Sequence, residues 1–186
     1  RRDAGARRPG RRLVIVLAID PGIEGAWAFH YDRGLPPYMD DLPVMGAKTS
    51  RQINAAQLVE DWRSLIRVNG KPAAAIVEDV HAMPKQGVTS SFKFGQAKGT
   101  LLGLLAAMEI PVFLPSPASW KAKMKLDSDG ETSRLQALQR WPALHTKLKL
   151  KKSHNMAEAA LLGAWFYEHH PAGRDQEKVL TAQNFW

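Results

Sequence analysis

The sequence predicts one α/β domain built on a mixed central sheet that is flanked by helices. Two apolar segments, 13–20 and 25–31, stand on either side of an Asp-Pro-Gly turn, which indicates an antiparallel hairpin. Two later apolar segments, 73–80 and 111–114, alternate with helical patterns, which is typical of parallel strands joined by crossovers. The 186 residues contain no internal repeat and no low-complexity linker, so one folded domain accounts for them.

Each predicted strand has an identifiable end. Segment 13–20 is apolar until Asp20, as a central strand would be, and 25–31 returns beside it. Segment 38–42 is a weaker candidate for a third strand because prolines flank it. Segment 73–80 is a further buried strand that ends in acids, and 111–114 is a short one. Together these segments predict a sheet with one antiparallel half and one parallel half.

Helices are expected between and after these strands. Ser50 can cap a helix whose apolar residues recur at helical spacing as far as Gly70. Further helices are expected over 91–108, 117–124, 132–141 and 155–169. In the first of these, three glycines at four-residue spacing form one smooth face, suited to a dimer contact or to close packing on the protein's own sheet: Gly95, Gly99 and Gly103.

Composition favours a negatively charged partner. The formal net charge is +8 and the pI about 9.9, as expected of a protein that binds nucleic-acid phosphates. Residues 1–12 hold six arginines and one aspartate, so the rest of the chain carries +3. We expect 1–12 to be a disordered tail or a transit-peptide remnant, although a cloning boundary or a DNA-binding arm would look the same. Residues 13–170 are expected to form the domain, and 171–186 a C-terminal extension.

Two absences narrow the class of protein. The chain has no cysteine, which excludes disulfides and thiolate metal sites and fits a reducing compartment. No apolar run approaches the ~20 residues that span a bilayer, so we expect a soluble, intracellular protein without a membrane partner.

Acidic residues end two of the predicted strands. Asp20 ends the first, and Glu78 lies near the end of segment 73–80. If these strands are neighbours, both carboxylates project from one edge of the sheet, where α/β folds place their sites. Adjacent ionised carboxylates are costly unless a cation compensates them, and Mg²⁺ prefers such ligands. Taken singly, Asp20 also fits a turn residue, and Asp79 could be the inward-facing acid in place of Glu78.

The last predicted helix offers two more candidate ligands. His154 and Glu158 are four residues apart, so they share a helix face and could reach the same sheet edge. The residues after Glu158 are small and apolar, which fits a helix packed tightly on the sheet. A carboxylate beside that surface needs a partner, and a metal would serve. By itself, His154 equally fits an exposed residue at a helix start.

Six stretches of the chain resemble one family of nucleases. They are AIDPG at 18–22 followed by Gly25 and Ala26, IVE at 76–78, PKQG at 84–87, SFKFG at 91–95, PSPASWK at 115–121 and KKSHNMAEAALL at 151–162. In this order they resemble the RuvC-type Holliday-junction resolvases. The middle stretches are similar to the chloroplast branch, the monokaryotic chloroplast 1 resolvases, and to related phage enzymes. The resemblance covers residues 13–167.

The resemblance implies an RNase H-like fold and a metal-dependent endonuclease. Such enzymes resolve four-way DNA junctions as homodimers, by two symmetric nicks. They use two Mg²⁺ or Mn²⁺ ions per site, which the resemblance assigns to Asp20, Glu78 and Glu158, with His154 as the catalytic histidine that coordinates a metal or moves protons. A preference for cytosine-containing junctions, read from the loop over 81–91, and a chloroplast location are also implied.

The chain departs from its relatives at the start of the last helix. Ser153 stands where many relatives have an acid. The spacing of bacterial relatives would pair Asn155 with Glu158, but Asn is a poorer ligand than Asp. We therefore favour His154 as the fourth metal-site residue and keep Asn155 in reserve.

The resemblance and the basic clusters together suggest which residues meet DNA. Phe92, Phe94 and His81 are aromatic and lie near the acids, so one of them could stack at the junction, although core packing is a strong alternative for Phe94. Lysines beside the predicted site offer phosphate contacts. The expected DNA-binding residues are His81, Lys85, Gln86, Gly87, Ser91, Phe92, Lys93, Lys121, Lys151 and Lys152.

Three other functions compete with this reading. An actin-like or sugar-kinase ATPase also begins with a strand-Asp-x-Gly hairpin, but it needs two such domains and an adenosine site, so we expect no nucleotide cofactor. An RNA–DNA hybrid nuclease would share the fold and the metals, although the Lys-Gln-Gly loop and His154 argue against it. A non-catalytic junction-binding module is the third, and the intact set of acids argues against that.

Overall fold

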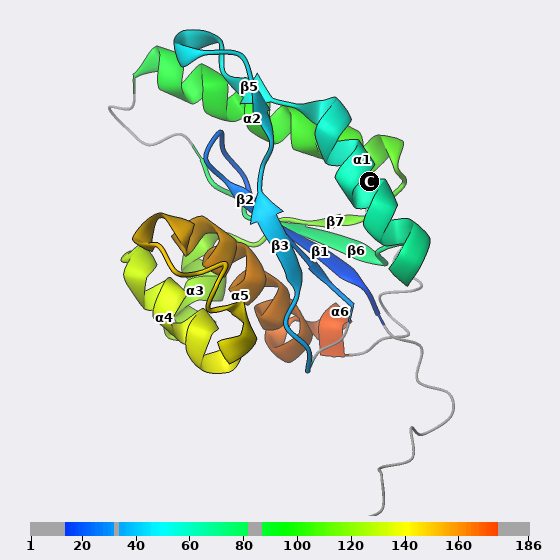
Figure 1. The fold of residues 1–186 in the computed structure, drawn as a ribbon, viewed down its shortest axis with the longest axis vertical. Helices are drawn as coiled ribbons and strands as arrows, with labels where there is room; N and C mark the ends of the chain where they lie inside the picture. The colour runs from blue at the N-terminus through cyan, green and yellow to red at the C-terminus, as the bar shows by residue number, and fades with distance from the viewer. Residues whose placement is uncertain (1–13, 32–33, 82–86, 175–186) are drawn as a thin grey trace, which may run out of the picture.

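The protein has a five-stranded sheet between two layers of helices (Figure 1). The computed structural model describes residues 14–31, 34–81 and 87–174. The strand order is β3-β2-β1-β6-β7; β1 pairs antiparallel with β2 and parallel with β6. The strands are β1 (Val16–Asp20), β2 (Ala26–His30), β3 (Tyr38–Asp41), β6 (Ala74–Val77) and β7 (Val112–Phe113). The predicted mixed sheet, with an antiparallel start and parallel strands after it, is confirmed.

The two helical layers differ in make-up. One face of the sheet is covered by α1 (Ala55–Asn69) and α2 (Val88–Ala107) (Figure 1). The other is covered by α5, with α3 and α4 packed against it. Their bounds, with those of the short α6 that follows, are α3 (Pro117–Met124), α4 (Gly130–Arg140), α5 (His154–His169) and α6 (Pro171–Arg174). Within the described residues, no helix is long and apolar enough to cross a membrane.

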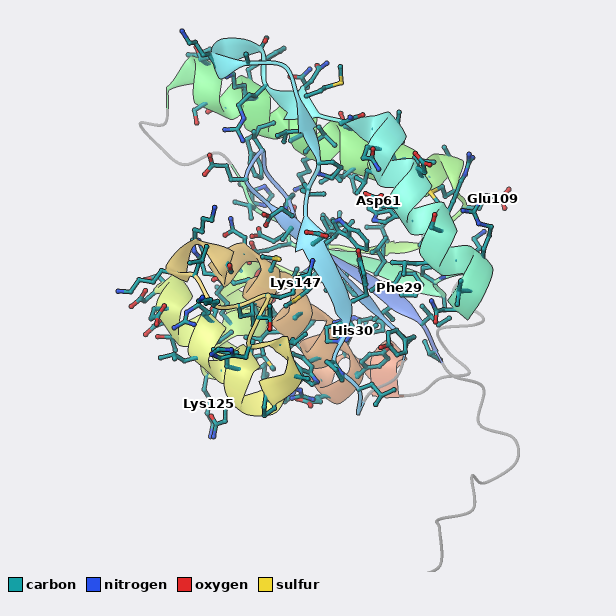
Figure 2. The ribbon with its side chains drawn as sticks, in the orientation of Figure 1. Phe29, His30, Asp61, Glu109, Lys125 and Lys147 are labelled. Atoms are coloured by element: carbon teal, nitrogen blue, oxygen red, sulfur yellow. The ribbon has the colours of Figure 1, made fainter. Side chains whose placement is uncertain are left out.

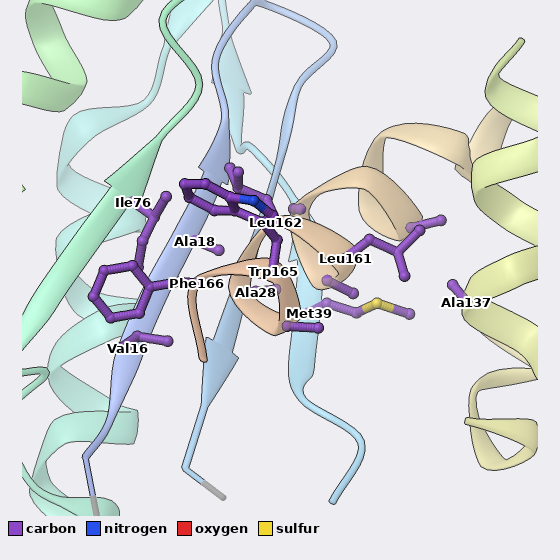
Figure 3. Packing of buried hydrophobic residues seen from close by; sticks show 14 of the residues in the cluster. Val16, Ala18, Ala28, Met39, Ile76, Ala137, Leu161, Leu162, Trp165 and Phe166 are labelled. Carbon is purple, nitrogen blue, oxygen red and sulfur yellow. The ribbon is translucent and has the colours of Figure 1, made fainter. Parts of the chain in front are cut away.

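Alternation along β1 divides the core into two clusters. Val16 and Ala18 face α5, whereas Leu17 and Ile19 face α1 and α2. This is the period-two alternation of any strand, and here both faces are apolar because helices cover both. Figure 3 shows Val16 and Ile76 of the sheet beside Phe166 of α5, and Leu161 of α5 on the side of Ala137 in α4.

The residues of α5 let it lie very close to the sheet. Every residue from Met156 to Tyr167 is buried, and many are Ala or Gly. A Cβ added at Gly163 would lie 2.3 Å from Nε2 of His30 in β2, so only glycine fits at this crossing. His30 is fully buried, and that burial lowers its pKa to about 3, so it is neutral. The close approach fixes where Glu158, on the first turns of α5, meets the sheet edge.

Several predicted boundaries need correction. Ser50 does not cap α1: it ends a 3-10 turn, η1 (Lys48–Ser50), and Asn54 is the N-cap, accepting a bond from Gln57 N–H at 3.3 Å. A small hairpin of β4 (Val44–Met45) and β5 (Gln52–Ile53), absent from the prediction, occupies this region. Helix α2 begins at Val88, three residues earlier than expected, and the helix over 132–141 begins at Gly130 because Asp129 caps it. The bounds of α3 were predicted correctly.

The glycine face of α2 is not packed on the sheet. A Cβ added at Gly95, Gly99 or Gly103 would have no neighbour within 4 Å among the described atoms. Val88 and Phe92, earlier on the same helix, are 87% and 71% exposed. Of the two roles expected for the glycines, close packing on the protein's own sheet is therefore wrong.

Candidate active site

The two strand-end acids meet at one edge of the sheet. Asp20 is the last residue of β1, and the backbone N–H of Glu78 donates to the carbonyl of Ile19 at 3.1 Å, directly continuing the β1–β6 pairing. Asp20 follows Val16 and Ala18 in the alternation, and Glu78 follows Ala74 and Ile76. Both acids therefore project to the α5 side of the sheet.

The surroundings of Asp20 disfavour a negative charge on its carboxylate. Burial raises its pKa well above the usual value, and the nearby charges of Glu78 and Glu158 raise it further, while Lys121 acts in the opposite direction. The residue keeps some accessible surface, but its carboxylate lies deep enough for desolvation to be the largest cause. Among the described residues, none donates a hydrogen bond to this carboxylate. Asp20 thus lacks the compensation that a buried carboxylate requires.

Glu78 is held by a tryptophan. Its side chain is buried, and Nε1 of Trp120 on α3 donates to Oε1 at 2.8 Å. Burial raises the pKa of Glu78, whereas the Trp120 hydrogen bond and the charge of Lys121 lower it. The carboxylate is thus oriented by one neutral donor while its other oxygen receives no bond from the described residues.

Glu158 completes the group from the helix side. It lies on α5 and is 8% exposed. Lys121 Nζ lies 2.8 Å from Oε2, and the hydroxyl of Ser133 on α4 donates to Oε1 at 3.1 Å. Three elements far apart in sequence, β1, β6 and α5, therefore bring three carboxylates together, with one lysine beside them.

Asp79 faces the opposite way. It bonds to Lys98 of α2 and to His81, whose Nε2 lies 3.3 Å from Oδ2. The Lys98 hydrogen bond is the main cause of its lowered pKa. Of the two acids after β6, Glu78 is therefore the one in the cluster, and strand alternation explains why.

The carboxylate group suits a divalent cation by its chemistry. Asp20, Glu78 and Glu158 are oxygen ligands, and their mutual repulsion is what a cation would relieve. Within the described residues, no three His, Asp or Glu side chains have the geometry of a metal site as they stand. In this structure the contacts of Lys121 and Ser133 use both oxygens of Glu158.

The predicted fourth metal-site residue lies at the first turn of α5. His154 Nδ1 is 3.2 Å from the carbonyl of Lys151, and its ring packs against Gly130 of α4. Neither contact involves the three carboxylates. Asn155 donates from its amide to the carbonyl of Glu24 in the β1–β2 turn. The helix start is therefore tied to that turn, beside the strand end that carries Asp20.

Two neighbouring pockets lie along the β1–β2 turn, and Asp20, Glu78 and Glu158 are not among the residues that line them. Their volumes are about 540 and 330 Å³, and Ile23, Glu24 and Arg51 line both. The larger pocket is also lined by Lys147, Lys152, His154 and Asn155, and the smaller by Lys48, Ser90, Lys93 and Phe94. Figure 2 shows Lys147 beside β3, where its Nζ lies 3.1 Å from Asp40. The two pockets form a groove with cations along its length.

The predicted DNA-binding residues are spread over several settings. Lys93 and Lys152 line the groove, and Phe92 is exposed on α2. Lys121 lies in the carboxylate cluster itself. The remaining members of the set that the structure describes are His81, Gly87 and Lys151, which are exposed, and Ser91, which is half-buried. Lys85 and Gln86 lie outside the described residues.

Sequence reasoning missed several residues at this edge. Ser133 comes from a helix with no recognisable motif, and Trp120 was noted only as part of a family stretch. Lys48, Arg51 and Lys147 line the groove but were not among the expected DNA-binding residues. The contact between Trp120 and Glu78 has no sequence signal, because it depends on where α3 lies against the sheet edge.

This chain resembles known proteins in its structure, whereas its sequence matches none of those compared. No protein-family model and no characterised protein matches the sequence. RuvC of T. thermophilus in complex with a Holliday junction substrate superposes with a TM-score of 0.51 at 18% identity, over 82% of this chain and 94% of that one. Thermus thermophilus RuvC in another structure gives 0.45 at 18% identity, over 82% and 95%. The yeast mitochondrial Holliday junction resolvase Ydc2 gives 0.45 at 15% identity, over 93% and 85%.

The first of these likenesses shows the fold. The mixed five-stranded sheet with its helices matches the RNase H-like fold of RuvC, as the sequence predicted. Function must be argued from the site, because one fold hosts many activities.

Proposed function

We propose that this protein is a metal-dependent endonuclease that resolves four-way DNA junctions by paired nicks. The observation that supports the proposal most is the convergence of Asp20, Glu78 and Glu158 at one sheet edge of a RuvC-like fold. The RuvC structure was solved with a Holliday junction substrate, and we extend that substrate class to this chain.

Asp20, Glu78 and Glu158 would hold two Mg²⁺ or Mn²⁺ ions. Bound ions of this kind supply an activated water and stabilise the leaving oxygen of a phosphodiester. Lys121 forms an ion pair with Glu158, and its charge acts to lower the pKa values of Asp20 and Glu78, which favours the charged state that binds cations. His154, one helical turn before Glu158, would move a proton or join the ligands.

A junction needs two cuts, so we propose that two copies of the chain act together. The exposed face of α2 supports this arrangement. Val88 and Phe92 expose apolar side chains there, and the glycines that follow leave the helix surface open. A second copy would cover this face. The preference for cytosine-containing junctions, read by the loop over 81–91, and the chloroplast location follow from the sequence resemblance.

The proposal is tested by offering the protein three substrates. A synthetic four-way junction, a linear duplex and an RNA–DNA hybrid are each incubated with and without Mg²⁺, and the products are separated on a denaturing gel. We expect Mg²⁺-dependent paired nicks in the junction alone. Cleavage of the hybrid would instead support the RNA–DNA hybrid nuclease. Junction binding without cleavage would support a non-catalytic module.

We propose that the DNA backbone lies in the groove along the β1–β2 turn. The groove carries Lys48, Arg51, Lys93, Lys147 and Lys152, and cations in such a row suit successive phosphates. Glu24 pairs with Arg51 at 3.3 Å where the two pockets meet. A phosphate at Arg51 would compete with this carboxylate.

Arg51→Gln is expected to weaken junction binding about threefold and to lower the slope of log affinity against log salt by about 1, because one phosphate contact is lost. Glu24→Gln is expected to tighten binding, since it removes a negative charge from the groove. Fluorescence anisotropy at several salt concentrations measures both.

Matched controls come from a second exposed ion pair. Lys71 and Glu109 lie 3.6 Å apart, and Figure 2 shows Glu109 at the far end of the α1–α2 layer from β5. Lys71→Gln and Glu109→Gln make the same charge changes away from the groove. If they alter affinity as much as the groove variants, only net charge matters and the proposed path is wrong.

A further inference from the structure

Two buried, uncharged side chains donate hydrogen bonds to carboxylates of the cluster. Trp120 Nε1 donates to Glu78 at 2.8 Å, and Ser133 Oγ donates to Glu158 at 3.1 Å. Both donor residues are 0% exposed, so both hydrogen bonds lie in the interior of the protein. Each donor reaches an acid on a different element, so the two bonds connect α3 and α4 to β6 and α5.

The Trp120 bond is unusual within this core. Trp27, Trp62 and Trp165 are also buried, and each has an indole N–H that is buried with no partner among the described residues. Packing of a tryptophan in this protein therefore does not require its N–H to be paired. Trp120 differs because α3 begins at Pro117 behind the Ser116 cap, which directs the indole at the end of β6.

The bonds restrict how the acids can turn. One oxygen of Glu78 is held by Trp120, so the other is directed away from α3. Glu158 is held on Oε1 by Ser133 and on Oε2 by Lys121. Nζ of Lys121 also lies 5.5 Å from the centre of the Trp120 ring, so the indole packs beside this cation as well. Neutral donors orient a carboxylate without supplying a charge that would compete with a bound cation.

We infer that Trp120, and with it Ser133, is a positioning residue that fixes the metal-binding carboxylates before a divalent cation arrives. This inference rests on the proposed function, because it assigns those carboxylates to a metal. Residues that orient ligands from behind typically change metal affinity about 10- to 100-fold when they are replaced.

The test compares two buried tryptophans. Trp120→Phe removes the donor and keeps an aromatic ring, and Trp62→Phe makes the same change at an equally buried site with no partner. Ser133→Ala is a smaller second variant that removes the bond to Glu158 if Trp120→Phe fails to fold. Binding of Mn²⁺ is measured by isothermal titration calorimetry on the purified full chain without DNA.

We expect Trp120→Phe to weaken Mn²⁺ binding at least about tenfold, and Ser133→Ala to weaken it in the same direction. Trp62→Phe should bind Mn²⁺ as the unchanged protein does, whatever its loss of thermal stability. The metal concentration for half-maximal junction cleavage should rise in parallel, and high Mn²⁺ should restore the rate. Unchanged Mn²⁺ affinity in both Trp120→Phe and Ser133→Ala would overturn the inference.

The hydrogen bond itself has a readout that needs no metal. In ¹H–¹⁵N spectra, Glu78→Gln should shift the indole signal of Trp120 more than those of Trp27, Trp62 and Trp165. Equal shifts of all four signals would show that the Trp120–Glu78 bond is absent. If the bond is present but the unchanged protein binds no Mn²⁺, the proposed metal-dependent function fails, and the positioning role fails with it. Normal Mn²⁺ binding that the variants do not alter overturns the positioning role alone.

Discussion

Asp20→Asn is expected to abolish junction cleavage and, at the same time, to make the protein more stable. The variant loses one of the three carboxylates that would hold the cations. Metal ions contribute several kcal/mol to such transition states, and each 1.36 kcal/mol is a factor of ten, so the rate should fall about 10³-fold or more. Single-turnover cleavage of a labelled junction at saturating Mg²⁺ measures the loss. Binding of the junction should persist, because the groove cations are untouched.

The gain in stability follows from the raised pKa of Asp20. Between the pKa of the unfolded chain and the higher pKa of the folded protein, the folded protein binds more protons. The free energy of unfolding therefore falls as pH rises through that window, and this loss of stability is still present at neutral pH. Asn at position 20 carries no charge, so the variant does not lose this stability. Without metal at pH 7, we therefore expect Asp20→Asn to melt at a higher temperature than the unchanged protein; in a chain of this size each 1 kcal/mol corresponds to about 2–4 °C.

Two further measurements separate this explanation from general stabilisation. The difference between Asp20→Asn and the unchanged protein should shrink at acid pH, where Asp20 is protonated. Mg²⁺ should raise the melting temperature of the unchanged protein and have less effect on the variant. Asp79→Asn is the matched control: the pKa of Asp79 is lowered by Lys98, so that change should reduce stability at pH 7. If Asp20→Asn and Asp79→Asn change the melting temperature equally, the raised pKa of Asp20 does not explain the gain in stability.

The meeting of Asp20 and Glu78 could be predicted from the sequence, because a side chain in a strand can face only one of two sides of the sheet. Asp20 and Glu78 each end an apolar run, and parallel neighbours with the same alternation must project both acids to one face. The choice between Glu78 and Asp79 remained open, because it depends on register. The pairing of Ile19 with Val77 decides it and gives Asp79 to Lys98 of α2.

The residues behind the acids could not be predicted, because their roles depend on how helices cross. Trp120 and Ser133 are separated from Glu78 and Glu158 by 42 and 25 residues and share no spacing with them. The groove likewise depends on the β4–β5 hairpin, whose two-residue strands are too short to have a recognisable period. Ser50 was a plausible helix cap, but it ends a 3-10 turn, and the N-cap of α1 is Asn54.

The β1–β2 turn behind Asp20 leaves no room for a side chain at Gly25. A Cβ added there would lie 2.1 Å from the carbonyl oxygen of Asp20 and 3.0 Å from the amide nitrogen of Gly22. Both are backbone atoms and cannot swing away as a side chain would. The backbone of Gly25 is also held on both sides, since its N–H donates to Gly22 and its carbonyl accepts from Leu42. A methyl group must therefore move the end of β1, which carries the first acid of the cluster.

Gly25→Ala is accordingly expected to damage both stability and cleavage. Crowding of this kind costs about 1–3 kcal/mol, which urea denaturation would detect. A displacement of about 1 Å at a catalytic group can cost about 10²-fold in rate, so we expect a loss of that order at saturating Mg²⁺. Gly95→Ala is the control for the stability measurement alone, because a Cβ at that exposed position of α2 has no neighbour within 4 Å among the described atoms. If Gly25→Ala loses stability but cleaves at the normal rate, the turn does not fix Asp20, and its closeness to the acid serves folding alone.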